Sequence, residues 1–218
     1  MDSVRYRPFG HGDFHDVARL IGETWWRDAD FASMRQLAGE KDLATCLRRT
    51  TWAEVAVGEE GQLAGFMLVR AGDADPEHDA RCKRQAEESS AKLHAVAPET
   101  ADLHDAYMAG EDTIHEKLLA QSGCDERFEV VTFIVAPGFQ GRGVGRALLE
   151  HAEAEIASKG AEEYFLYTDD ACNWGFYEHM GLRCTATYET SAEERELMLP
   201  GYYLFTGDPR RSLGGASA

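Results

Sequence analysis

The stretch VTFIVAPGFQGRGVGRALLEHAEAEI, from Val131 to Ile156, constrains the fold more than any other part of the sequence. A run of β-branched and aromatic residues ends at Pro137, and apolar residues then recur at helical spacing after a cluster of glycines. The glycines of this cluster are Gly138, Gly141, Gly143 and Gly145. Glycine costs conformational entropy, so such a cluster marks backbone that turns tightly or approaches a neighbour closely. The pattern predicts a strand, a glycine-rich turn and a helix in direct succession.

Two nucleotide-binding motifs can be tested against these glycines. A P-loop requires G-x-x-x-x-G-K-[ST], and no lysine followed by serine or threonine stands after the cluster, which excludes that motif. A dinucleotide turn requires G-x-G-x-x-G; Gly141 and Gly143 fit its first two positions, but the third falls on Arg146. Asp169 stands at about the distance expected for a ribose-binding carboxylate. A nicotinamide nucleotide therefore stays open as an alternative ligand.

The backbone itself predicts an anion site at this turn. The segment QGRGVG, residues 140–145, presents N–H groups with few side chains at a helix N-terminus. Free N–H donors and the helix dipole together attract anions there. Arg142 and Arg146 add positive charge beside the turn. A pyrophosphate is the natural ligand of such a site.

The overall charge narrows the choice of partner. The 218 residues include 22 Lys and Arg against 39 Asp and Glu, a formal net charge of −17. Such a surface repels nucleic acid and anionic membranes, so neither is expected as a partner, whereas a cationic small molecule is tolerated. No apolar run reaches the roughly 18 residues of a membrane helix, and the N-terminus lacks the apolar core of a secretory signal. We expect a cytoplasmic protein.

The cysteines and histidines suggest neither a disulfide framework nor a metal site. Five cysteines without C-x-x-C spacing are typical of reduced thiols. His78 and Cys82 are four residues apart, but no second pair completes a metal site. Cys172 has no recognisable histidine and acid partner, so we interpret it as a small buried residue. We predict no metal.

The rest of the chain predicts a mixed α/β fold. Strands are expected over residues 4–8, 52–57, 63–70, 128–136, 164–168, 182–189 and 202–206, and helices from residue 13 and over 33–49, 143–159 and 173–180. The strand 128–136 is nearly continuously apolar, which is typical of a strand buried on both faces. The charged segment 73–126 predicts an insertion of two or three helices. We expect one domain over residues 1–206, carrying this insertion, and a frayed tail over 207–218.

Two motifs together resemble a known family. Gln140-x-x-Gly143-x-Gly145, directly after a strand that ends in V-A-P, resembles the acyl-coenzyme A loop of the GNAT superfamily of N-acetyltransferases. The segment YFLYTDDACNWGFYEHMGLRC is similar to the fifth strand of that family, its next helix and the turn into the sixth strand. The resemblance covers about residues 128–184. It implies the GNAT acyltransferase fold, in which helices flank a central mixed, largely antiparallel sheet and strands four and five splay apart.

The resemblance also implies which residues hold the acyl donor, acetyl-CoA. Backbone groups near Phe133 and Val135 pair with the pantetheine amides as an added strand would. The amides of residues 140–146 hold the pyrophosphate, and Asn173, which is also a common helix N-cap, contacts the arm of the donor. The predicted donor-binding residues are Phe133, Val135, Gln140, Gly141, Arg142, Gly143, Val144, Gly145, Arg146 and Asn173.

Catalytic roles follow from the same resemblance. Tyr177 is the expected general acid, which protonates the departing thiolate, and its alternative is a ring that only packs in the core. A free amine is mostly protonated at pH 7, so a base is needed. Glu129 is the predicted base, with a solvated glutamate at the start of the strand as the alternative and Glu23 as a weaker candidate. Trp25 and Trp26 either pack or line an acceptor pocket.

The predicted function is transfer of an acetyl group from acetyl-CoA to a primary amine of a small molecule or peptide. The amine attacks directly while both substrates are bound, and the net charge slightly favours a cationic acceptor. A non-catalytic acyl-CoA-binding or regulatory module, which uses the insertion as a partner surface, is the alternative. The insertion can be a lid, a dimer surface or an element that selects the acceptor. Dimers are common in the family, so a homodimer is considered.

Overall fold

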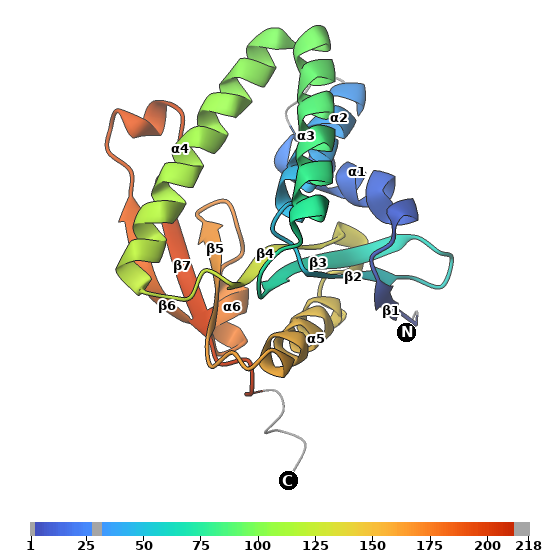
Figure 1. Ribbon diagram of the computed structural model, residues 1–218, viewed down its shortest axis with the longest axis vertical. Coiled ribbons are helices and arrows are strands. Elements are labelled where there is room, and N and C mark those ends of the chain that lie inside the picture. Colours follow the sequence, from blue (N-terminus) through green and yellow to red (C-terminus); the bar gives the residue numbers. More distant parts are fainter. Residues whose placement is uncertain (1–2, 28–31, 212–218) are drawn as a thin grey trace.

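The computed structural model describes residues 3–27 and 32–211, and the strands among them form one mixed sheet (Figure 1). The strands are β1 Arg5–Pro8, β2 Trp52–Val57, β3 Leu63–Ala71, β4 Phe128–Val135, β5 Tyr164–Asp169, β6 Arg183–Glu189 and β7 Gly201–Gly207. Their spatial order is β1-β2-β3-β4-β5-β7-β6, and every neighbouring pair is antiparallel except the parallel pair β4–β5. The predicted mixed α/β fold is confirmed.

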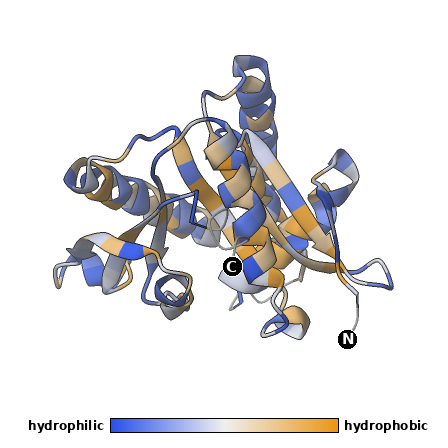
Figure 2. Ribbon diagram, turned by 90° about the horizontal axis from the view of Figure 1, so that it is seen from below, coloured by the Kyte–Doolittle hydropathy of each residue, from blue (hydrophilic) through white to orange (hydrophobic). Residues whose placement is uncertain are grey.

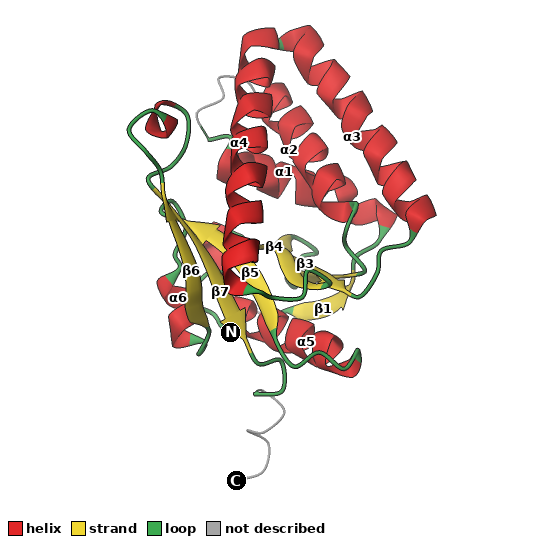
Figure 3. Ribbon diagram, turned by 60° about the vertical axis from the view of Figure 1, so that its left-hand side comes forward, coloured by secondary structure: helices red, strands yellow, loops and turns green. Residues whose placement is uncertain are grey.

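Helices cover both faces of this sheet. They are α1 Phe14–Trp25, α2 Ala32–Leu47, α3 Pro76–Val96, α4 Pro98–Ser122, α5 Val144–Ser158 and α6 Gly175–His179, with short 3₁₀ turns η1 His11–Asp13, η2 Pro137–Phe139 and η3 Glu194–Glu196. Helix α5 packs on one face of β2–β4, and α1 and α2 pack on the other (Figure 1). Helix α4 lies over β6 and β7 (Figure 3). No helix within the described residues is long and apolar enough to cross a membrane.

Strand β3 shows how the two halves of the core are divided. Met67 and Val69 belong to the apolar cluster on the α5 side, whereas Phe66 and Leu68 belong to the cluster on the α1–α2 side. Successive side chains of a strand point to opposite faces, so a continuously apolar strand can be buried on both. Burying each such side chain stabilises the fold by about 1.5–3 kcal/mol. Figure 2 shows the same concentration of apolar residues in the central strands.

The segment predicted as an insertion contains two long helices. Helix α3 begins after Asp75, whose carboxylate accepts a hydrogen bond from the backbone N–H of Glu77 at 3.2 Å. Only Ala97 separates α3 from α4, because Pro98 cannot continue a helix but fits the first position of a new one. Gly123, at φ 69°, ends α4. The chain therefore forms a helical hairpin between β3 and β4.

Strands β4 and β5 separate soon after they meet. They share one paired position, Glu129 with Phe165, although β4 pairs with β3 at seven positions and β5 with β7 at six. Beyond this point the sheet is open between them, as the resemblance implied. Val131, Phe133 and Val135 consequently remain half-exposed. The strand contributes to the apolar clusters on both faces of the sheet, through Val130 and Ile134, as its sequence predicted. Its C-terminal half is less completely covered because no strand pairs with it on the β5 side.

The C-terminal segment divides into a packed and an undescribed part. Residues 212–218 of the predicted tail lie outside the described residues. Arg211, just before them, forms an ion pair of 2.6 Å with Glu153 of α5, which is fully buried. This ion pair attaches the end of β7 to α5.

Candidate active site

The glycine-rich turn forms the expected cradle at the start of α5. Gly141 and Gly143 have φ angles of 73° and 83°, a region that favours glycine. A Cβ at either position would meet no atom within 4 Å, so the turn is open outward. Gly143 is the N-cap of α5, and no side chain caps this end. The first N–H groups of the helix therefore remain available for an anion.

Gly145 has a different role from its neighbours. A Cβ at this position would lie 2.9 Å from Cζ of Phe133, which no real contact tolerates without a shift. The Phe133 ring in turn lies 5.7 Å from that of Phe176 on α6. Gly145 thus permits α5 to pack closely on β4 beside the opening between β4 and β5.

Replacing Gly145 by alanine tests this packing role. We expect Gly145→Ala to lower the free energy of unfolding by about 1–2 kcal/mol, because overpacking at Phe133 outweighs the better helix propensity of alanine. Thermal unfolding measures the change. Gly138→Ala is the matched control, since a Cβ there meets nothing within 4 Å and its φ is not positive. Equal losses in the two variants would contradict the packing role.

The other predicted donor-binding residues lie around this cradle. The Gln140 side chain donates a hydrogen bond to the carbonyl of Val135 at 3.1 Å and so fixes the end of β4. The exposed Arg142 guanidinium lies over the Phe139 ring, 5.5 Å from its centroid, and Arg146 is also exposed. Val144 is buried, so only its backbone can face a ligand.

Asn173 lies across the opening, in the loop between β5 and α6. It is exposed. The N-cap of α6 is Trp174, and no side chain caps this helix, so Asn173 does not serve as the cap. The short helix spans Gly175–His179 rather than the predicted 173–180. The structure therefore brings the glycine loop, β4 and the Asn173 loop to the same end of the sheet.

Tyr177 lies on α6, beside the same opening. Its ring contacts Phe205 at 5.9 Å and Phe176 at 5.6 Å, and it is half-buried. Its hydroxyl forms no hydrogen bond with any other described residue. Burial raises the pKa of Tyr177 above its usual value, and the nearby Cys172 and Asp169 raise it further. The hydroxyl therefore remains protonated at neutral pH and can donate a proton.

Glu129 lies in a buried ion pair. Only 4% of its surface is exposed, so the solvated interpretation was wrong. Arg49, which follows α2, donates from Nε to Glu129 Oε2 at 2.9 Å and from Nη2 to Oε1 at 3.1 Å. Both carboxylate oxygens are thus engaged by the guanidinium.

Helix α4 contributes polar groups that the sequence did not single out. Tyr107, Glu111 and His115 are spaced four residues apart and share one face of the helix. The Tyr107 hydroxyl donates to Glu111 at 3.3 Å and lies 3.1 Å from the hydroxyl of Tyr202 on β7. Burial, followed by the charge of Asp169, raises the pKa of Glu111 to about 7. The regular spacing was the available signal for this group.

His115 fixes α4 to β5. Its ring stacks on Tyr167 with centroids 3.9 Å apart and planes 7° apart, and the Tyr167 hydroxyl donates to the His115 carbonyl at 3.2 Å. Burial and the charge of Arg49 lower the pKa of His115 to about 3. The ring is therefore neutral at pH 7.

The tryptophans and Glu23 do not gather at this site. Trp26 is buried, donates from Nε1 to Asp42 of α2 at 2.8 Å, and lies against His104 of α4 with ring centroids 4.1 Å apart. The packing interpretation of Trp26 is confirmed. Trp25 is 50% exposed, and Glu23 is also exposed.

The structure shows how exposed Cys172 is and whether His78 and Cys82 lie close together. Cys172 is exposed, so its interpretation as a buried residue was wrong. His78 and Cys82 do contact each other, with Nε2 and Sγ 3.5 Å apart. Among the described residues, no three His, Cys, Asp or Glu side chains are placed to hold a metal ion.

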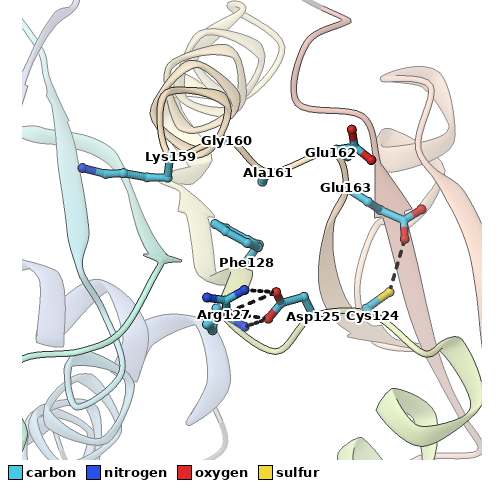
Figure 4. A pocket seen from close by; sticks show the side chains of 9 residues that line it. All are labelled: Cys124, Asp125, Arg127, Phe128, Lys159, Gly160, Ala161, Glu162 and Glu163. Carbon is cyan, nitrogen blue, oxygen red and sulfur yellow. Dashed lines mark hydrogen bonds and ion pairs between the residues drawn. The ribbon is translucent and has the colours of Figure 1, made fainter.

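A cavity of about 400 Å³ lies at the opposite end of β4 and β5 (Figure 4). Its lining includes Phe128 at the start of β4 and Glu163 just before β5. An ion pair between Arg127 and Asp125 and a contact of 3.7 Å between Cys124 and Glu163 occupy its rim. Ligands of parallel strands bind beyond the carboxyl ends, where the glycine loop and Tyr177 lie. This cavity is therefore separate from the candidate active site.

Comparisons with known proteins agree with this geometry. A model of the Acetyltransferase (GNAT) family matches residues 20–182. Arylalkylamine N-acetyltransferase 2 from Aedes aegypti has a similar structure, with a TM-score of 0.59, 15% identity, and coverage of 95% of this chain and 99% of that one. Spermidine/spermine N-acetyltransferase SpeG from Vibrio cholerae has a TM-score of 0.51 at 13% identity, covering 98% and 97%. The ribosomal-protein-S18-alanine N-acetyltransferase from Escherichia coli has a TM-score of 0.51 at 13% identity, covering 94% of each chain. No curated protein matches the sequence.

Proposed function

Because this chain belongs to the GNAT acetyltransferase family, we propose that it moves an acetyl group from acetyl-CoA to a primary amine of a small molecule or peptide. The observation that carries the proposal is the opening between β4 and β5 beside the cradle of Gly141 and Gly143. A pyrophosphate fits the cradle, and an extended chain fits along the unpaired edge of β4.

The donor supplies an acetyl thioester. In this proposal the N–H groups of residues 140–146 bind its pyrophosphate, with Arg142 and Arg146 beside them. The half-exposed backbone around Phe133 and Val135 holds the pantetheine part, and Asn173 contacts it from the α6 side. Together these residues direct the thioester into the opening, toward Tyr177.

Tyr177 is the proposed general acid. Its protonated hydroxyl donates to the departing sulfur while the amine attacks the carbonyl carbon directly, with both substrates bound. The position of Tyr177 supports this role, because Phe176 and Phe205 hold its ring while its hydroxyl has no hydrogen-bond partner among the described residues. A non-catalytic acyl-CoA-binding module would have no use for such a group.

The acceptor side of the opening is acidic. Asp169 at the end of β5 and Asp112 of α4 both lie near enough to Glu111 to raise its pKa. Clustered carboxylates attract a protonated amine, which supports a cationic acceptor. The names of the solved neighbours range from arylalkylamine to spermidine/spermine and ribosomal-protein acceptors, so the fold alone does not select among them. The cytoplasmic location, the single domain and the absence of a metal remain predictions.

Calorimetric titration with acetyl-CoA, CoA and NAD tests the donor site. We expect acetyl-CoA to bind at about micromolar strength and Gly143→Asp to weaken it at least 100-fold, because a carboxylate repels the pyrophosphate and the positive φ is strained. Gly160→Asp is the matched control. It lies just beyond the other end of α5 with the same φ of 83°, and a Cβ there also meets nothing within 4 Å.

Each outcome has a definite meaning. Binding that survives in Gly160→Asp and is lost in Gly143→Asp supports the donor site. NAD binding in place of acetyl-CoA would overturn it in favour of a nicotinamide nucleotide. Acetyl-CoA binding without turnover of any amine would favour the non-catalytic module.

A further inference from the structure

We infer that Glu111, on the inserted helix α4, is the general base that takes the proton from the acceptor amine, an inference that rests on the function proposed above. Neither the family model nor the sequence motifs point to this residue. Glu111 lies on the α4 side of β5 and accepts a hydrogen bond from Tyr107.

The two faces of β5 carry different machinery. Tyr164 and Leu166 belong to the cluster around α5, against which Tyr177 also packs. Phe165 and Tyr167 belong to the cluster around α4. By the alternation of a strand, Asp169 continues the α4 side. Tyr177 and Glu111 thus lie on opposite faces of the sheet.

The opening between β4 and β5 connects these faces. Since the strands pair only at Glu129 and Phe165, the part of the sheet next to Asp169 is not closed by hydrogen bonds. Asp169 pairs with Tyr202 of β7, whose hydroxyl lies 3.1 Å from that of Tyr107. Tyr107 in turn donates to Glu111, and the charge of Asp169 raises the pKa of both Glu111 and Tyr177. A donor held from the α5 side and an acceptor held from the α4 side can therefore meet in the opening, with an acid on one side and a base on the other.

Glu111 is held in place by neighbours that leave it able to accept a proton. Tyr107 donates to Oε1 at 3.3 Å, and Tyr107 is itself within 3.1 Å of the Tyr202 hydroxyl. Leu199 N–H donates to that hydroxyl at 3.2 Å, so the arrangement is anchored to the β7 side of the sheet. The second carboxylate oxygen has no hydrogen-bond partner among the described residues. Glu129, by contrast, has both oxygens bonded to Arg49.

The groups facing Glu111 set its proton affinity. The titratable and charged groups that affect it, from each element packed around it, are Tyr107 and Asp112 of α4, Asp42 of α2, Asp169 of β5 and, through Tyr107, Tyr202 of β7. Burial and the charges of the three aspartates raise the pKa of Glu111 to about 7, whereas the hydrogen bond from Tyr107 acts to lower it. A base works best when its pKa lies near the working pH, so Glu111 is suited to remove a proton at neutral pH.

Glu111 and Tyr177 together account for every proton that moves in the reaction. The bound ammonium gives one proton to Glu111, and the neutral amine then forms the C–N bond while the C–S bond breaks. Tyr177 gives its proton to the departing sulfur and is restored by the second proton lost from the nitrogen. Overall, an ammonium and an acetyl thioester yield an acetamide, a free thiol and one proton, which Glu111 releases to solvent.

The first test is the pH dependence of turnover. With an alkylamine acceptor and free-thiol detection, we expect kcat/KM of the wild type to rise as pH increases through about 7. Glu111→Gln should lower kcat at least 100-fold and remove this rise, while acetyl-CoA binding stays within about threefold of the wild type. Glu116→Gln is the matched control, because it removes the same charge from an exposed residue of α4 that is not among the groups acting on Glu111, and it should retain the rise.

A weakly basic acceptor separates proton removal from acceptor binding. A primary aromatic amine is already neutral at pH 7 and needs no base. The deficit of Glu111→Gln should therefore shrink at least tenfold with this acceptor. An equal deficit with both amines would overturn the role of Glu111 as a base.

The unliganded protein provides a readout that is independent of activity. A carboxyl with a raised pKa stabilises the fold while it is protonated, so its contribution is lost as pH rises between about 4.5 and 7. The melting temperature of Glu111→Gln relative to the wild type should increase by roughly 3 °C or more over this range. A constant difference would overturn the assigned proton affinity.

The failure of this inference can be distinguished from failure of the proposed function. If the wild type acetylates an amine and Glu111→Gln does so equally well with the same pH profile, the inference is wrong and the acetyltransferase function stands. If the wild type binds acetyl-CoA but turns over neither amine, both are overturned.

Discussion

Tyr177→Phe should lower kcat at least 100-fold and leave the dissociation constant of acetyl-CoA nearly unchanged. A positioned general acid contributes roughly 10²- to 10⁴-fold to a rate, and the phenyl ring retains the contacts with Phe205 and Phe176. Because burial, Cys172 and Asp169 raise the pKa of Tyr177, the wild type should lose no activity through its ionisation up to about pH 9. Steady-state kinetics with free-thiol detection measure both effects.

Tyr6→Phe is the control for this variant. Tyr6 is another half-buried tyrosine, but it lies on β1 at the far edge of the sheet, where its ring meets that of His151. This control should retain nearly full turnover. If Tyr177→Phe also turns over at the rate of the wild type, the tyrosine only packs in the core and sulfur is protonated by another donor.

The fold was largely predictable because its signals are local. The alternation and apolar runs of the strands and the helical spacing of α1, α2 and α5 locate these elements to within a few residues. The glycine loop and the helix bearing Tyr177 are also short contiguous motifs, which explains why the donor side could be anticipated. Along β4 the local signal predicted a central strand, but a continuously apolar sequence does not show that β5 diverges from it.

The acceptor side was not predictable in the same way. The ion pair between Arg49 and Glu129 joins residues 80 positions apart, and the contact between Tyr107 and Tyr202 spans 95 positions. The first pair depends on how the end of α2 packs on the sheet, and the second on how the inserted helix α4 packs on β7. Neither kind of packing leaves a mark on local periodicity. The base was therefore expected at Glu129 of β4, inside the stretch that resembles the family, although the structure also offers a carboxylate from α4.

Arg49→Met should be among the most destabilising single changes near this site, lowering the free energy of unfolding by about 2–4 kcal/mol. Removing one member of a buried pair leaves the other charge uncompensated, and Glu129 has almost no access to solvent. The expected loss of unfolding free energy is smaller than for a fully buried ion pair, because 39% of the Arg49 side chain is exposed to solvent. Chemical denaturation of the two single variants and the double variant measures it.

The double variant Arg49→Met/Glu129→Met then separates a structural role of the pair from a catalytic one. Replacing both charges by apolar side chains of similar size removes the uncompensated carboxylate, so most of the lost stability should return. If Glu129 serves only to hold Arg49 against the sheet, the double variant should acetylate amines within about tenfold of the wild type. It should also keep the rise of kcat/KM through pH 7. If stability returns but turnover does not, Glu129 is required for the chemistry itself, and the base belongs on β4 rather than on the inserted helix.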